Sequence, residues 1–220
     1  MEEQVITGKE IGRAAQRALE YQRYLFRRAY GVYYFIWALA ILLLTLPAPL
    51  STFLGLTGIL APAVTIAADA VILLGAAFAT ARIFSNVLRS LELRHVLEPG
   101  RGRRRPFYFA GWLGLTYVIV FAAGVLLPAY SQAILFAALV PIPFVIFYLL
   151  GLAFPGKRPV EGLLAVSAYG VSAALSLVLS LLGIYQSVIT IVWVVTVSVW
   201  LFAAVFALLR APHELEALRG

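Results

Sequence analysis

The chain has 220 residues, of which 63% are hydrophobic and only 12% are charged, and its mean hydropathy is +0.96. A soluble globular domain is about 45–50% apolar and about 25% charged, so this composition excludes an ordinary soluble protein. It indicates a polytopic protein of the lipid bilayer with an all-α fold. The net charge of +7 is typical of the Lys and Arg excess in cytoplasmic loops, and we expect no nucleic-acid partner.

An amphipathic basic helix is predicted in residues 1–30. Thr7 and Glu10 have the spacing of a capping box, which predicts a helix start there. Apolar residues then recur every three or four positions, and arginines fill the other side of the helix. Such a helix suits the headgroup layer of an anionic leaflet, and docking on a partner protein is the alternative.

Six apolar stretches follow, and we interpret them as transmembrane helices. The predicted spans are 31–46, 56–81, 107–127, 130–154, 162–183 and 185–209. Aromatic residues at 33–37 predict an interfacial belt at the start of the first span. The second span is predicted to continue as a helix beyond Arg82, and the connection 47–55 before it is predicted to be a loop.

The charge distribution predicts how the chain is threaded. All 17 Lys and Arg residues lie in the N-terminal segment, the second-to-third loop, the fourth-to-fifth loop or the tail 210–220. Six spans place these four segments on one side, which the positive-inside rule makes cytoplasmic. The sequence therefore predicts a cell-membrane protein with both termini and the tail in the cytoplasm.

The spans are further predicted to form three helical hairpins. The second, fourth and sixth spans all end in apolar residues followed by an arginine, which suggests an internal repeat. Membrane composition alone produces such matches, so chance similarity is an equal alternative. In the fifth span, small residues recur every fourth position and would let another helix approach closely: Ala168, Ser172, Ser176 and Ser180.

Asp69 lies near the middle of the second span and is the most informative residue of the chain. A charge at the bilayer centre costs roughly 2.5–3.5 kcal/mol, and no basic residue lies within the predicted spans to neutralise it. Asp69 could be protonated and bonded to Thr65 or to a freed carbonyl, or it could face a water-filled cavity. It could also bind a proton, a metal ion or a cationic substrate, or pair with a cation of a partner subunit.

Pro141 and Pro143 fall near the centre of the fourth span and predict a kink there. Interrupted helices at the bilayer midplane are typical of transporter sites, and a plain packing kink is the alternative. The candidate substrate or ion site is therefore formed by Asp69, Thr65, Pro141 and Pro143.

A basic cluster precedes the third span. Its arginines are interpreted as a topology anchor, with anionic lipid headgroups as the alternative ligand: Arg101, Arg103, Arg104 and Arg105. The chain has no cysteine, and both of its histidines, His95 and His213, fall outside the predicted spans. We find no catalytic, nucleotide-binding or metal-ligand motif, so we expect no enzyme, no cofactor and no metal site.

The layout resembles that of permease subunits of ABC-type exporters, in topology alone. Both have an amphipathic N-terminal helix, a long cytoplasmic loop after the second span and six spans. The chain departs from that pattern at its last outward loop, 183–187, which is too short for a re-entrant segment. We expect a small-solute or ion transporter, or the permease subunit of a transport complex with a cytoplasmic ATPase, another membrane subunit or a second copy. The alternative is a non-transporting membrane scaffold or assembly subunit.

Overall fold

The computed structural model describes residues 8–58, 60–92, 126, 131–154, 158–184 and 186–216. Within these residues the chain is helical and has no β-strand, which confirms the predicted all-α class for this part. Four stretches are long and apolar enough to cross a membrane, which indicates a membrane protein: Ala63–Leu91, Ala133–Ala153, Val160–Leu181 and Val188–Glu214. The predicted first span, 31–46, is not among these four stretches, and the predicted third span lies outside the described residues except for residue 126, so six spans in three hairpins stay a prediction.

Helix α1 (Gly8–Leu43) runs without a break through both the predicted amphipathic segment and the predicted first span. Its 36 residues extend over about 54 Å at the usual helical rise. Gly31, at the predicted boundary, does not end the helix. A β-carbon at this position would stand 2.9 Å from Leu208 on helix α8 (Gln186–Glu216), so the glycine allows α1 and α8 to approach closely.

The prediction of a loop between the first two spans is wrong in one respect. Helix α2 (Pro47–Phe53) occupies seven residues of this connection. Its two prolines make the segment look like a loop. Pro47, however, stands in the first helical turn, where a missing N–H removes no hydrogen bond.

Helix α3 (Leu60–Glu92) begins four residues after the predicted start of the second span, contains the rest of that span and continues beyond Arg82, as predicted. A hydrogen bond connects α3 to α1: Trp37 Nε1 of α1 donates to Thr80 Oγ1 of α3 at 3.0 Å. Most of its large apolar side chains are exposed on the surface of the protein. This pattern is the one expected of a helix that faces lipid along much of its length.

The predicted break in the fourth span is present. Helix α5 (Ser131–Leu139) and helix α6 (Ile142–Ala153) are separate, with Pro141 as the N-cap of α6. Because Pro141 carries no N–H, the helical hydrogen-bond ladder cannot continue through it. Pro143 lies in the first turn of α6, where a missing N–H removes no helical hydrogen bond. Its ring packs against helix α7 (Val160–Leu181).

The small-residue stripe of the fifth span packs against α8. Ser172 and Ser176 of α7 are both buried. The hydroxyl of Ser172 forms a hydrogen bond with that of Thr196, and Trp193 Nε1 donates to Ser176 Oγ at 3.1 Å. Small side chains thus let the two helices approach closely. Their hydroxyls form hydrogen bonds with polar groups that would have no partner in lipid.

Aromatic side chains form the core between α1, α7 and α8. The ring of Trp200 lies 5.9 Å from that of Tyr34 and 5.5 Å from that of Tyr169, centroid to centroid. Tyr34 is 1% exposed, so its predicted place in an interfacial belt is wrong. The helical period turns this residue towards α7 and α8, whereas Phe35, its neighbour, is exposed.

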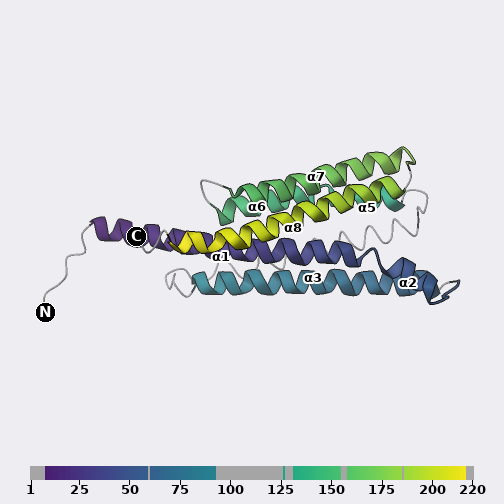
Figure 1. Ribbon diagram of the computed structural model, residues 1–220, viewed down its shortest axis with the longest axis horizontal. Helices are drawn as coiled ribbons and strands as arrows, with labels where there is room; N and C mark the ends of the chain where they lie inside the picture. The colour runs from purple at the N-terminus through teal and green to yellow at the C-terminus, as the bar shows by residue number, and fades with distance from the viewer. Residues whose placement is uncertain are drawn as a thin grey trace.

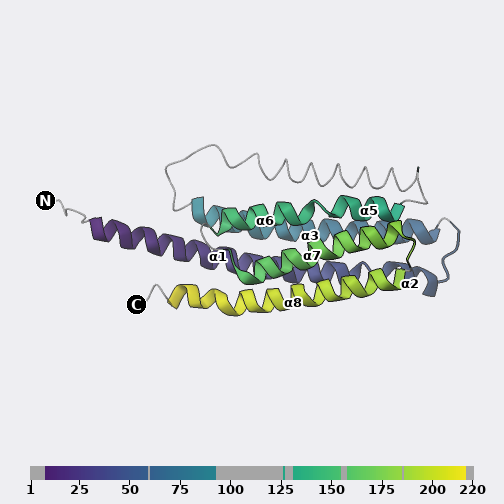
Figure 2. The same ribbon diagram turned by 90° about the horizontal axis from the view of Figure 1, so that it is seen from above.

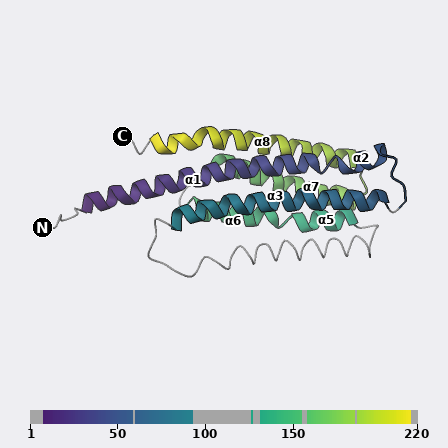
Figure 3. The ribbon, with the colours of Figure 1, turned by 90° about the horizontal axis from the view of Figure 1, so that it is seen from below.

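The helices form an elongated bundle (Figure 1). Helix α1 packs along α8, α8 along α7, and α7 against α5 and α6, while α3 packs on α1 and α2. Figures 2 and 3 show that α1 begins, and α3, α6 and α8 end, at the same end of the bundle. We call this the charged end, because the arginines of α1, of the C-terminal parts of α3 and α8, and of the residues just before α7 lie towards it along the chain: Arg13 to Arg28, Arg82 and Arg89, Arg210, and Arg158.

Candidate functional site

Asp69 lies within the part of α3 that is long and apolar enough to span a membrane. The other charged residues of this helix are Arg82, Arg89 and Glu92, all towards its C-terminal end. The carboxyl group is partly buried, and its Oδ1 atom is shielded from solvent without a hydrogen-bond partner in the described part of the chain. A carboxyl oxygen that can accept a proton or a cation therefore lies shielded from solvent on an apolar helix.

The other residues of the predicted site lie apart from Asp69. Thr65, one turn away, donates its hydroxyl to the carbonyl of Ala61 at 3.0 Å, so it is engaged with its own helix. Pro141 and Pro143 belong to the α5–α6 break, which packs against α7, whereas α3 packs on α1 and α2. No hydrogen bond among the described residues joins these groups, and their joint role stays a prediction. The arginines of the predicted lipid cluster, 101–105, lie outside the described residues.

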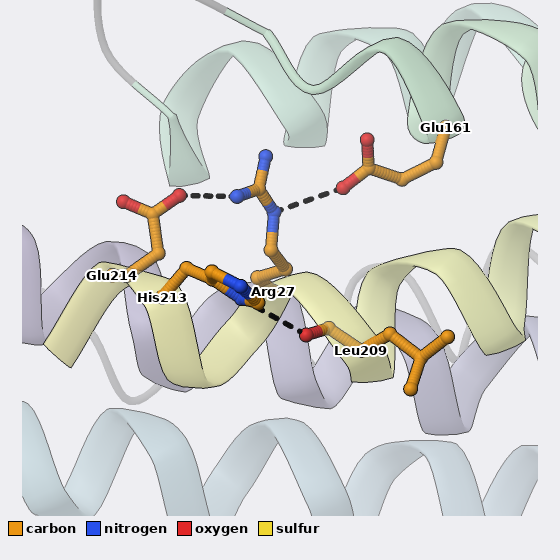
Figure 4. A network of polar contacts seen from close by, with 5 residues as sticks. All are labelled: Arg27, Glu161, Leu209, His213 and Glu214. Atoms are coloured by element: carbon orange, nitrogen blue, oxygen red, sulfur yellow. Dashed lines mark hydrogen bonds and ion pairs between the residues drawn. The ribbon is translucent and has the colours of Figure 1, made fainter. Parts of the chain in front are cut away.

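A second polar site, which the sequence did not predict, lies at the charged end. Arg27 of α1 contacts two carboxylates from two other helices (Figure 4). Its Nε donates to Glu161 Oε1 at 2.9 Å, and its Nη1 donates to Glu214 Oε1. We call these three residues the Arg27 clamp, since they connect α1, α7 and α8 at one point.

Local structure explains how each residue of the clamp is presented. Glu161 follows Pro159 and lies in the first turn of α7, where free backbone N–H groups favour a carboxylate. Glu214 is carried by the last turns of α8, which continues as a helix beyond the predicted span. The side chain of Glu161 is only 2% exposed, against 14% for Arg27 and 23% for Glu214. The negative charge of the buried Glu161 carboxylate is therefore balanced by the positive charge of Arg27.

Two buried polar atoms lie beside the clamp. Glu161 Oε2 and the Tyr34 hydroxyl are both shielded from solvent, and no described residue forms a hydrogen bond with either atom. The Tyr34 hydroxyl lies 3.1 Å from the position that a β-carbon would take on Gly162, the residue after Glu161. A carboxylate oxygen accepts hydrogen bonds and a phenol donates them, so the two groups are chemically complementary.

An open hollow of about 400 Å³ adjoins the clamp on the side of α8. It is lined by Arg27, Arg210, His213 and Glu214. The Nδ1 atom of His213 lies 3.2 Å from the carbonyl oxygen of Leu209 (Figure 4). Among the described residues, no group of three or more His, Cys, Asp or Glu side chains could hold a metal ion.

The sequence contains only an indirect signal for the clamp. Arg27, Glu161 and Glu214 look like ordinary charges of segments outside the membrane. Glu161 is nevertheless an acidic residue two positions after Pro159, at the start of an apolar stretch. An acid in that position is typical of the first turn of a helix, which could have marked it.

Comparisons with known proteins add no further assignment. No protein-family model, no curated protein and no solved structure matches this chain. Its function must therefore be argued from the geometry of Asp69 and of the Arg27 clamp.

Proposed function

We propose that this membrane protein is a transporter of a small solute or ion, or the membrane subunit of one. The observation that carries the proposal is the buried, unpartnered Oδ1 of Asp69 in a helix long and apolar enough to cross the membrane. An unpaired carboxylate at the bilayer centre costs roughly 2.5–3.5 kcal/mol. Binding a proton or a small cation removes that cost, which is the elementary step of ion-coupled transport.

Two further features support the proposal. The α5–α6 break interrupts a candidate span near its middle, as in transporters whose unwound segments bind substrate. The Arg27 clamp joins three helices at the charged end, where a transport pathway would have to open. In this proposal Asp69 binds the coupling ion, and separation of the clamp accompanies opening on that side.

Replacing Asp69 by asparagine is expected to reduce ion flux to the protein-free background. The amide keeps the shape of the carboxyl group but can neither carry a proton at neutral pH nor balance a cation. The measurement is flux into liposomes that contain the purified full chain, with a pH-sensitive dye for protons and with sodium or potassium gradients for cations.

Glu20→Gln is the matched control, because Glu20 is a carboxylate of α1 hydrogen-bonded to Gln16 on an exposed surface. It is expected to keep the wild-type flux. Flux in Asp69→Asn that equals wild type, with an unchanged thermal unfolding midpoint, would remove the main support for transport.

The alternative function is a membrane scaffold that holds another protein in the bilayer. It is favoured by the outward side of α3, where large apolar side chains are exposed: Val71, Leu74 and Phe78. We expect a scaffold to purify from its native membrane in gentle detergent with one stoichiometric membrane partner. The double variant L74A/F78A should then lose that partner, whereas Phe202→Ala, an exposed residue of α8, should keep it. Purification of the chain alone would contradict the scaffold.

A further inference from the structure

Arg158, just before α7, turns its side chain back along α6. Its guanidinium carbon lies 4.0 Å from the centre of the Phe147 ring. Its Nη2 atom lies 2.8 Å from the position that a β-carbon would take on Gly151. A β-carbon at position 151 would require the flexible guanidinium to move away, so the glycine and the aromatic ring together form a seat for Arg158 in its present position.

The seat lies inside the end of an apolar helix. Gly151 and Phe147 precede the last residue of α6, Ala153, by two and six positions, which places them about 3 and 9 Å along the helix from its end. This depth corresponds to the boundary between the hydrocarbon core and the headgroups. The side chain of Arg158 is exposed there, on the outside of the bundle.

No carboxylate of the described part of the chain neutralises Arg158. Glu161, three residues away, is bound to Arg27, and the ion pairs of the described residues are those of the Arg27 clamp. The Phe147 ring covers one face of the guanidinium, and the N–H groups at its edge remain unused by described residues. A guanidinium edge presents paired donors that match the oxygens of a phosphate group.

We propose that Arg158, Phe147 and Gly151 form a binding site for one anionic phospholipid at the charged end. The lipid phosphate accepts hydrogen bonds from the guanidinium edge of Arg158. The acyl chains lie along the exposed apolar side chains of α6 beside the seat, with Phe144 on the side of the membrane centre: Phe144, Tyr148 and Leu152. The site is independent of Asp69 and does not rest on the proposed transport.

The test is native mass spectrometry of the purified full chain titrated with phosphatidylglycerol, with phosphatidylcholine of the same acyl chains as the neutral comparison. We expect one phosphatidylglycerol to bind at least about tenfold more tightly than phosphatidylcholine. Arg158→Gln should remove this preference, since charge-assisted hydrogen bonds to phosphate supply it. Arg82→Gln is the matched control, because Arg82 is an exposed arginine in the C-terminal part of α3, and it should keep the preference.

Two further variants test the seat itself. Gly151→Ala should displace the guanidinium, and Phe147→Leu should remove its aromatic support, so both should weaken phosphatidylglycerol binding while the charge of Arg158 stays. If Arg158→Gln does not fold, these two variants still test whether the site binds phosphatidylglycerol. The proposal is overturned if R158Q, or both seat variants, bind phosphatidylglycerol as the R82Q control does. It is equally overturned if millimolar inorganic phosphate displaces the lipid, which would show a site for free phosphate.

Discussion

Replacing Arg27 by alanine is expected to lower the free energy of unfolding by about 3–5 kcal/mol, the usual cost of removing one partner of a buried ion pair. The loss is large because Glu161 is 2% exposed and would keep its charge without compensation. Glu214 is partly exposed and can be solvated by water instead, so the loss of its ion pair lowers the free energy of unfolding by less. Unfolding of the purified protein in mixed detergent micelles, followed by tryptophan fluorescence, measures the change.

Arg28→Ala is the control for this prediction, since Arg28 is the exposed neighbour of Arg27 and removes the same charge. It should change the unfolding free energy by less than about 0.5 kcal/mol. Adding Glu161→Gln to Arg27→Ala should recover part of the loss, because the uncompensated buried charge is gone. If the double variant loses the sum of the two single losses, the clamp is not a coupled unit.

Truncation of Trp200 to alanine is the second large effect that we expect. Trp200 is 2% exposed and packs against the rings of Tyr33, Tyr34 and Tyr169, so alanine leaves a cavity between α1, α7 and α8. Similar truncations in soluble cores cost roughly 3–5 kcal/mol. In a bilayer the separated helices still contact apolar lipid, so we expect a loss of about 2–3 kcal/mol.

Trp200→Phe separates packing from hydrogen bonding. The indole Nε1 donates to the carbonyl of Ala165 at 2.8 Å, and phenylalanine removes this bond but keeps most of the ring. Interhelical hydrogen bonds in membranes contribute about 0.6 kcal/mol on average, so Trp200→Phe should lose much less than Trp200→Ala. Equal losses in the two variants would show that the hydrogen bond, not the ring, dominates. Phe202→Ala, on the lipid side of α8, should have little effect.

The apolar helices could be predicted from the sequence because a membrane span needs a long apolar segment that can be counted directly. The break at Pro141 could be predicted for a similar reason, since a missing N–H acts within one helix. Helix α2 could not, because its seven residues with two prolines carry no periodic signal. The side of α1 that Tyr34 faces depends on where α7 and α8 pack, which local sequence does not contain.

The clamp is beyond sequence reasoning for the same physical reason. Arg27 is separated from Glu161 by 134 positions and from Glu214 by 187. Their meeting depends on the packing of three helices and on the continuation of α8 beyond Arg210. Asp69 could be singled out because a charge within an apolar run is anomalous by itself. Its distance from the α5–α6 break depends on helix order in space, which only the structure provides.

The unbroken course of α1 has a mechanical consequence. The helix extends about 28 Å from its first residue to the point where Arg27 is held by two other helices. Because the helix has no break between this segment and the part that packs along α8 and α3, a tilt of one part moves the other. A rotation of 10° about Arg27 would move the first turn of α1 by about 5 Å and the part of the helix beyond Arg27 in the opposite direction. A force on the first turn of α1 would thus be transmitted to the aromatic core, because Tyr33 and Tyr34 of the same helix pack against Trp200.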